Sequence, residues 1–293
     1  MNNLEIAHRR LHNQHVTRRT LETPQTLVEW LGAVQAQDYA AAKWALGLRL
    51  HGMTDDNIEQ AFTDGKILRT HVMRPTWHFV SPADIRWLLA LTAPRVRAAS
   101  AYYNRKLELD AAFFRRTHAV LANALQGGKQ LTRDELASAL QQAGIATDGE
   151  QRVTYIMMRA ELDGIICSGA RRGKQFTYAL LAERAPQARS LDRDEALAEL
   201  TVRYFTSHGP ATIQDFVWWS GLTAADARAG LAMVTSNLLH ETMDGQTYWF
   251  SPSTPPEQNL SQAAYLLPNY DEYTVGYTDR STIFDALHTN KLD

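Results

Sequence analysis

The pattern of hydrophobic and polar positions predicts the same sequence of helices and strands in three stretches of the chain. In the middle stretch, residues 110–128 have apolar side chains at helical spacing. Residues 131–144 give a second helix, with Thr132 as its N-cap and Glu135 three residues later. Residues 151–164 give a third. The pattern therefore predicts three consecutive helices in this part of the chain.

Two short apolar segments, IICS and FTYALL, follow the third helix and are separated by the Gly-flanked basic turn 169–175. Such a turn between apolar segments is typical of a β-hairpin. Three helices followed by a hairpin are the winged-helix plan, in which a helix-turn-helix is backed by a two-stranded wing.

The other two stretches repeat this order. The C-terminal copy ends in the hairpin 238–250, whose turn is Asp244-Gly245. Its helices are expected at 195–209, 211–221 and 223–237. The N-terminal copy is expected to have helices at 4–16, 23–34, 39–50 and 54–65 and a strand pair at 66–80.

We therefore predict a mainly α fold with small β-hairpins (α+β), made of three tandem winged-helix units and a short C-terminal β region. Pro-Ala at 82–83 and the segment 182–190 are the expected linkers, and 251–259 is a third break. The last unit is expected to be β because 263–280 is rich in Tyr and Val. The predicted units are 1–81, 82–185, 186–252 and 260–293.

Composition places the chain among globular proteins, because 293 residues with 45% hydrophobic content can form sizeable cores. No window approaches the roughly 18 to 20 uninterrupted apolar residues of a membrane span. The segment 1–10 is polar and charged, so we expect a cytoplasmic protein with no membrane association. The single cysteine, Cys167, cannot form an internal disulfide or a multi-thiolate zinc site and is expected to be a small buried residue.

Charge is distributed unevenly along the sequence. Residues 1–120 carry 16 Lys and Arg against 11 Asp and Glu, whereas residues 184–293 carry 7 against 14. Seven of the ten histidines also lie in the first 120 residues. An anionic partner would therefore meet the N-terminal part first, although ordinary surface variation is an alternative explanation.

The sequence lacks the motifs of phosphate-binding loops, dinucleotide-binding folds, zinc peptidases and α/β-hydrolases. These absences argue against nucleotide hydrolysis, zinc proteolysis and acyl transfer, and no metal or cofactor is expected. The remaining candidate residues cluster in the N-terminal copy: Gln35, Gln37 and Asp38, then Arg69, His71, Arg74, Thr76 and His78.

The two glutamines, Gln35 and Gln37, would be about 200° apart on a continuous helix and could not face one point. They converge only if the helix ends between them. Asp38 supports that break, because it is a suitable N-cap for a helix beginning at Tyr39. The glutamines then lie in the turn of a helix-turn-helix; the alternative is that each caps or solvates a helix end.

Alternation within residues 69–80 predicts a strand pair with two different faces. Trp77, Phe79 and Val80 would help to form the core, and the Arg, His and Thr side chains would line the other face, where they suit phosphate contact. The basic turn has the same character, with a plain solvated surface as the alternative. Its candidate DNA-binding residues are Arg171, Arg172 and Lys174.

Three segments, AVQAQDYAAAKWALGLR, RPTWHFV followed by DIRWLLAL, and LLPNYDEYTVGYTDR, together resemble the AlkZ-like winged-helix DNA glycosylases. The resemblance runs over nearly the whole chain. Its most specific element is a Gln-hydrophobic-Gln triplet, matched here by Gln35, Ala36 and Gln37; a sister subgroup carries Asp in place of the second glutamine. The family fold is described as three tandem winged helices with a C-terminal β-barrel, whose strands continue past the segment that corresponds to DALHTNKLD.

The resemblance implies a monofunctional, metal-free, monomeric DNA glycosylase that hydrolyses the N-glycosidic bond of N7-alkylated or interstrand-crosslinked purines in duplex DNA. Because N7 alkylation makes the base cationic, the base leaves as a neutral molecule and little acid catalysis is required. Gln35 and Gln37 would position the water. Asp38 would cap its helix or stabilise the cationic sugar, and Arg69, Arg74, His71 and His78 would lie near the lesion or its phosphates.

Two other functions remain open from the sequence. One is a non-enzymatic tandem winged-helix DNA-binding protein, such as a transcriptional regulator, which would read base edges with a recognition helix. The other is an inactive relative that binds lesions without releasing a base. Both DNA-binding alternatives and the glycosylase predict that affinity falls with salt.

Overall fold

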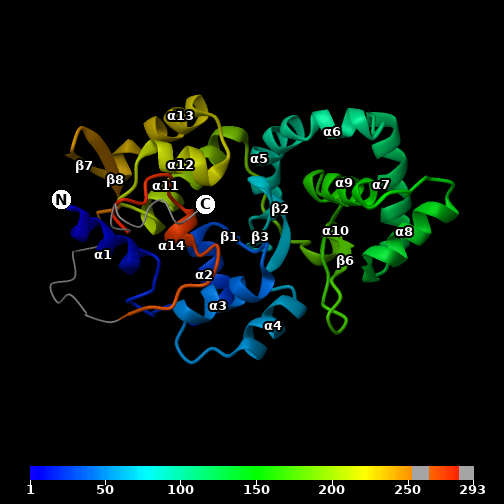
Figure 1. Ribbon diagram of the computed structural model, residues 1–293, viewed down its shortest axis with the longest axis horizontal. Helices are drawn as coiled ribbons and strands as arrows, with labels where there is room; N and C mark the ends of the chain where they lie inside the picture. The colour runs from blue at the N-terminus through cyan, green and yellow to red at the C-terminus, as the bar shows by residue number, and fades with distance from the viewer. Residues whose placement is uncertain (253–263, 284–293) are drawn as a thin grey trace. The chain divides into compact units, whose positions relative to one another are not determined.

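The computed structural model describes residues 1–252 and 264–283 (Figure 1). The chain divides into two compact units. Unit 1 combines Met1–Ile58 with Leu191–Asp293, and unit 2 is the continuous segment Glu59–Ser190. The strand pair expected at 66–80 therefore belongs to unit 2, and the boundaries of the three winged helices stay a prediction.

Unit 1 is mainly helical. Its N-terminal part contains α1 (Asn3–Asn13), α2 (Pro24–Leu31), β1 (Val34–Gln35), α3 (Tyr39–Arg49) and the start of α4 (Asp55–Thr63). Its C-terminal part contains α11 (Arg193–Ser207), α12 (Ile213–Ser220), α13 (Ala224–Val234), the 3₁₀ helix η1 (Thr235–Asn237), β7 (Leu239–Met243), β8 (Gln246–Phe250) and α14 (Glu272–Val275). The hairpin expected at 238–250 is confirmed, because β7 and β8 pair antiparallel across Asp244 and Gly245, which both have positive φ.

Aromatic side chains form much of the core of unit 1. Tyr204 is fully buried, and its ring lies 5.2 Å from that of Phe216 and 5.0 Å from that of Trp219. These residues come from α11 and α12, so the core joins the first two helices of the C-terminal copy. Offset and tilted ring contacts of this kind add to the stabilisation that burial provides.

Unit 2 contains the middle copy and the first strand pair. Its elements are β2 (Leu68–Val72), β3 (Arg74–Val80), α5 (Ile85–Ala99), α6 (Ala101–Lys106), α7 (Ala111–Leu125), β4 (Leu131–Thr132), α8 (Arg133–Gln142), α9 (Glu150–Leu162), β5 (Ile166–Ser168), β6 (Thr177–Leu180) and α10 (Leu181–Arg184). The three helices expected between 110 and 164 are confirmed. Thr132 and Glu135 form the capping box at the start of α8. Helices α5 and α6 were not among the elements expected from the pattern.

Two antiparallel sheets and a leucine-rich core organise unit 2. Strand β2 pairs with β3, and β6 lies between β4 and β5 in a second sheet. Leu121, Leu136 and Ile156 are fully buried in one cluster drawn from α7, α8 and α9. The helical periodicity that predicted these helices also brings their apolar faces together.

The β character expected for 263–280 is wrong for the part of it that the structure describes. Residues 264–283 contain the short helix α14 and irregular backbone, and no strand. Asp271 caps this helix by accepting the backbone N–H of Tyr273 at 2.9 Å. The side chains of Tyr273 and Tyr277 are both buried in unit 1. The remainder of the predicted region 260–293 lies outside the described residues.

Candidate functional site

The segment that carries the two glutamines is not helical. Helix α2 ends at Leu31, three residues earlier than expected, because Gly32 has a φ of 81° and turns the chain out of the helix. Val34 and Gln35 then form β1. The expected helix break between Gln35 and Gln37 is therefore wrong, since the helix has already ended: Gln35 lies in the strand and Gln37 in the bend that precedes α3.

Helix α3 begins directly after the glutamines. The side chain of Asp38 accepts the backbone N–H of Ala41 at 3.0 Å, which is N-cap geometry. Asp38 and Gln37 are exposed, whereas Gln35 is only 8% exposed. The motif thus lies at the edge of the buried region, with its first glutamine mostly inside and its second at the surface.

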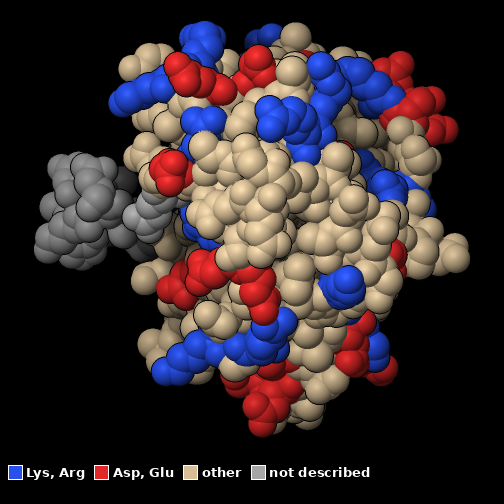
Figure 2. Space-filling model, turned by 90° about the vertical axis from the view of Figure 1, so that its right-hand side faces the viewer, with Lys and Arg blue, Asp and Glu red and all other residues tan. Residues whose placement is uncertain are grey.

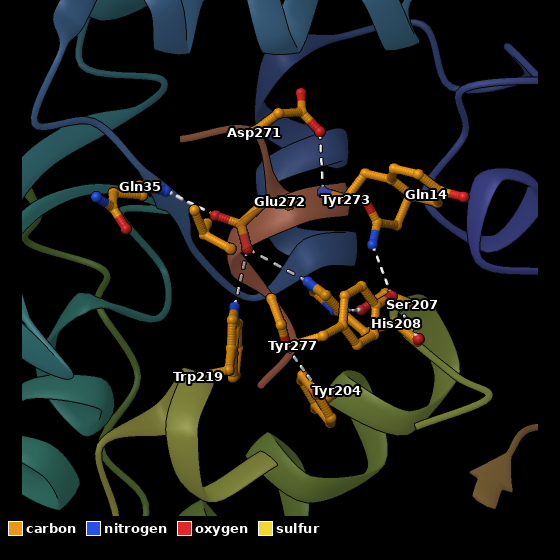
Figure 3. Close-up of polar contacts among 12 residues, drawn as sticks. Gln14, Gln35, Tyr204, Ser207, His208, Trp219, Asp271, Glu272, Tyr273 and Tyr277 are labelled. Atoms are coloured by element: carbon orange, nitrogen blue, oxygen red, sulfur yellow. Dashed lines mark hydrogen bonds and ion pairs between the residues drawn. The ribbon is translucent and has the colours of Figure 1, made fainter. Parts of the chain in front are cut away.

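Gln35 is attached through its backbone to a buried acidic side chain. Its backbone N–H donates to Oε1 of Glu272 at 2.8 Å. Figure 3 shows the side-chain amide of Gln35 pointing away from Glu272, so this contact leaves the amide to face elsewhere. Glu272 is 1% exposed and lies at the start of α14.

The second oxygen of Glu272 meets two further groups (Figure 3). Nε1–H of Trp219 donates to Oε2 at 2.9 Å, and Nε2 of His208 lies 3.4 Å from the same atom. Trp219 also packs at the end of α2, where a Cβ on Gly32 would lie 3.3 Å from its ring. The side chain of Glu272 therefore joins β1, α11 and α12 around the glutamine segment.

His208 is fully buried, and its neighbours hold its ring in place. Its Nδ1 lies 2.8 Å from Oγ of Ser207, and its ring stacks on Tyr204 at 4.8 Å. Burial lowers the pKa of His208 below its ordinary value, while the hydrogen bond and charge of Glu272 oppose that shift.

A buried ion pair holds the segment before α14. Arg49 of α3 donates from two nitrogens to the two oxygens of Asp271, both at 2.7 Å, and also to Oε1 of Gln14 at 3.0 Å. Burial lowers the pKa of Arg49, but the adjacent Asp271 carboxylate outweighs it and leaves that pKa above its ordinary value. The segment NYDEYTVG is thus fixed to unit 1 by charge as well as by packing.

Sequence reasoning used this segment only as a family marker and missed the role of Asp271 and Glu272. The available signal was a pair of acidic residues within an otherwise aromatic and apolar stretch. Such residues are seldom buried unless they have partners. The partners lie on other elements, so their identity was outside the reach of a local pattern.

The face assignment predicted for the strand pair 69–80 is wrong for Arg69 and His71, although Phe79 and Val80 lie in the core as predicted. Arg69 pairs with Phe79 and His71 with Trp77 across β2 and β3. Directly opposed residues of antiparallel strands point to the same side, so Arg69 and His71 share a face with the aromatic residues. The physical reason is that β2 is buried along both faces, so no face was left for solvent.

Arg69 and His71 are occupied inside unit 2. The guanidinium of Arg69 lies 4.4 Å from the ring of Trp77 and 4.5 Å from that of Phe176. Nδ1 of His71 contacts Oε2 of the buried Glu161. Arg69 is 8% exposed and His71 is 5% exposed. Their side chains therefore stabilise the core of unit 2 and have little surface available for contact with phosphates.

The other predicted DNA-binding residues vary in exposure. His78 is 1% exposed, and its Nδ1 lies 3.0 Å from the carbonyl oxygen of Thr76, whereas Arg74 and Thr76 are half-buried. Arg172 and Lys174 are exposed at the turn between β5 and β6. Arg172 donates to Glu135 at 2.7 Å, and Arg171 lies 3.5 Å from Glu59.

The two units differ in charge. Unit 2 carries 19 Lys and Arg against 12 Asp and Glu, and unit 1 carries 11 against 20. The difference in net charge between the two structural units is therefore larger than the difference between the N-terminal and C-terminal parts of the sequence. Figure 2 looks onto the right-hand face of Figure 1, where α7 and α8 lie, and shows basic side chains interspersed with acidic ones around an uncharged centre.

The described part of the chain lacks features of several other kinds of site. Within residues 1–252 and 264–283, no group of three or more His, Cys, Asp or Glu side chains could hold a metal ion. None of the helices described there is long and apolar enough to cross a membrane. Cys167 is buried, as expected, and burial raises the pKa of its thiol to about 12.

Comparison with solved structures defines the class of fold. The chain superposes on Streptomyces sahachiroi DNA glycosylase AlkZ with a TM-score of 0.81, at 22% sequence identity, and the match covers 98% of this chain and 80% of that one. The architecture is therefore an AlkZ-like fold, mainly helical with small antiparallel sheets.

The family itself follows from the sequence. The profile described as DNA glycosylase AlkZ-like matches residues 28–292, and the chain belongs to this family. The interstrand DNA cross-link repair glycosylase of Streptomyces sahachiroi is 26% identical over 221 residues, which cover 73% of this chain and 59% of that protein. The chain thus spans less than two thirds of that relative's length in the match. The resemblance seen in the sequence is confirmed at the level of the family, and the Gln-hydrophobic-Gln subgroup stays a prediction.

Proposed function

We propose that this protein is a monofunctional DNA glycosylase that hydrolyses the N-glycosidic bond of N7-alkylated or interstrand-crosslinked purines in duplex DNA. The observation that carries the proposal is the backbone of the glutamine segment. Gln35 is held through its N–H to Glu272, its side-chain amide points the other way, and Gln37 follows two residues later at the surface. Membership of the AlkZ-like family supports the same activity.

Two amides suit the chemistry of a cationic leaving base. The alkylated purine departs as a neutral molecule, so the enzyme has to supply a positioned water and dipoles directed at the positive charge that develops on the sugar. A glutamine offers one carbonyl acceptor and two N–H donors and does not titrate. Gln35 and Gln37 would hold the water, and neither can act as a general base, so activity on uncharged bases is expected to be weak.

Unit 2 is the better candidate for holding the DNA backbone, because it has the excess of positive charge. We propose that α7, α8, α9 and the β5–β6 hairpin form a winged helix whose turn, with Arg171, Arg172 and Lys174, contacts phosphates. Arg74 and Thr76 are the remaining candidates on the first strand pair. Asp38 keeps its helix-capping role in this proposal.

The structure offers no support for a regulator that reads bases with α3. The two cationic residues of that helix are buried and paired inside unit 1: Lys43 with Asp55 at 2.8 Å, and Arg49 with Asp271. A recognition helix needs side chains that reach base edges. The exposed Trp44 is the main large side chain left on the helix surface.

The test is release of 7-methylguanine from alkylated duplex DNA by the wild type and by Gln35→Ala and Gln37→Ala. Each substitution is expected to lower kcat by about 10- to 100-fold, because the water loses one of its partners. Gln60→Ala is the matched control, since Gln60 is an exposed glutamine outside the motif and should behave as the wild type. Binding of the alkylated duplex without release by any of the four proteins would instead identify a lesion-binding relative.

A further inference from the structure

The acidic side chain of Glu272 is 1% exposed, and its part in the mechanism proposed above is the contact with the backbone of Gln35. One of its neighbours, His208, is itself held in place. Nδ1 of His208 lies 2.8 Å from Oγ of Ser207, and the His208 ring stacks on Tyr204 at 4.8 Å. His208 is therefore fixed beside Glu272.

The two oxygens of Glu272 meet three nitrogen atoms. The backbone N–H of Gln35 donates to Oε1 at 2.8 Å, and Nε1–H of Trp219 donates to Oε2 at 2.9 Å. Nε2 of His208 lies 3.4 Å from Oε2, and a neutral imidazole with its hydrogen on Nε2 donates to a carboxylate there. The carboxylate therefore connects the glutamine segment to α12 and to the end of α11.

Charges around the pair favour a neutral His208. Burial lowers the pKa of His208, and the nearby cations Arg49 and Arg10 lower it further, against the hydrogen bond and charge of Glu272. The ionisable groups of the surrounding elements are Arg10 of α1, Arg49 of α3, Tyr204 of α11, Asp215 of α12, and Asp271, Tyr273 and Tyr277 of the C-terminal segment.

We propose that Glu272 is a positioning residue for the glutamine motif, and that its carboxylate fixes the backbone of Gln35 to the groups around it. The carboxylate uses both oxygens. Oε1 accepts the backbone N–H of Gln35, while Oε2 accepts from Trp219 and faces Nε2 of His208. This inference rests on the proposed glycosylase function, because it concerns how the water-holding amide of Gln35 is kept in place.

A glutamine cannot reproduce these contacts. With its NH₂ in place of Oε2, the amide of Glu272→Gln could not accept from Trp219, so two donors would oppose each other at the 2.9 Å separation. Trp219→Phe removes the opposing donor. The combination Trp219→Phe/Glu272→Gln is therefore expected to recover part of what Glu272→Gln loses.

The first measurement is steady-state kinetics on 7-methylguanine release. Glu272→Gln is expected to lower kcat by about 10-fold or more with KM nearly unchanged, because the substitution moves the motif without touching DNA. Asp215→Asn is the control, since Asp215 is another fully buried carboxyl group of unit 1 with no contact to Gln35. An equal loss of kcat in both variants, or an unchanged kcat in Glu272→Gln, would overturn the proposal.

The second measurement is the same kinetics on the double variant, Trp219→Phe/Glu272→Gln. Its kcat is expected to exceed that of Glu272→Gln, because the donor that opposes the amide is gone. A double variant with a kcat equal to or below that of Glu272→Gln would contradict the proposed role of these contacts.

The third measurement separates this inference from the proposed function. Hydrogen exchange at the backbone amide of Gln35 requires no activity, and it should be slow in the wild type, faster in Glu272→Gln and unchanged in Asp215→Asn. A wild type that releases no base but shows this pattern would refute the glycosylase function and leave the role of Glu272 intact. A wild type that releases base, with Gln35 exchange and kcat unaffected in Glu272→Gln, would refute the inference alone.

Discussion

The Arg49–Asp271 ion pair offers a sharp test of how the C-terminal segment is held. Both side chains are essentially inaccessible, at 1% and 0% exposure, and two hydrogen bonds of 2.7 Å join them. Asp271→Asn keeps a side-chain oxygen that can cap α14 at Tyr273. It removes the negative charge and one of the two acceptors of Arg49, and so separates the ion pair from the helix cap.

The size of the effect follows from burial. Removing one partner of a buried ion pair costs about 3 to 5 kcal/mol, because the other charge remains in a poorly polarisable site. Arginine cannot escape by losing its proton. For a unit of this size, each kcal/mol lowers Tm by about 2 to 4 °C, so Asp271→Asn should lower Tm by roughly 6 to 20 °C.

The assay is urea and thermal denaturation followed by tryptophan fluorescence. Five of the seven tryptophans lie in unit 1, so the signal reports mainly on the unit that contains the pair. Arg193→Gln is the control, because Arg193 pairs with Asp226 at the surface and its side chain is 55% exposed. Such a pair contributes about 0 to 1 kcal/mol.

Two results would refute the reasoning. One is a loss in Asp271→Asn no larger than that in Arg193→Gln. The other concerns Arg49→Met/Asp271→Asn, which removes both charges and should be more stable than Asp271→Asn alone. A double variant less stable than the single one would mean that Arg49 stabilises unit 1 through contacts other than this pair.

Two further predictions concern backbone and pH. Gly32→Ala should destabilise the protein by about 1 to 3 kcal/mol in urea denaturation, because a Cβ there meets Trp219 and φ is 81°. Gly52→Ala, at a similar φ in open space, should cost only about 1 kcal/mol, and equal losses would contradict the packing argument. Burial lowers the pKa of His118 below 6.5, against the opposing charge of Asp163. The unfolded chain therefore binds this proton more readily, and stability present above pH 6.5 is lost as pH falls through the folded pKa. His118→Asn should reduce the fall between pH 7.5 and 5.5 measured by the same denaturation; an unchanged fall would contradict it.

Much of the fold could be predicted from local pattern. The capping box of Thr132 and Glu135 and the Asp244-Gly245 turn are signals contained within four residues, and both elements lie where expected. The helical periods of α7, α8 and α9 are equally local. In each case the residues that determine the structure are neighbours in the sequence.

The errors have a different origin. The face of β2 was assigned from alternation alone. Arg69 contacts Phe176 and His71 contacts Glu161, each about 90 to 110 residues away in the sequence, and these contacts make the burial of Arg69 and His71 favourable. The β-like segment near Tyr273 became a helix because Asp271 caps it and Arg49 binds Asp271. The two glutamines were found by their chemistry, but the group that holds Gln35 was not, since Glu272 lies 237 residues further along the chain.

That long separation also sets the order in which the protein can be completed during synthesis. Unit 2 is continuous and can fold as soon as Ser190 has left the ribosome, whereas unit 1 must wait for residues near 272. At about 5 to 20 residues per second, the interval between translation of Gln35 and of Glu272 is roughly 12 to 47 s. The glutamine motif is therefore among the first parts of the chain to be made and among the last to acquire its final conformation.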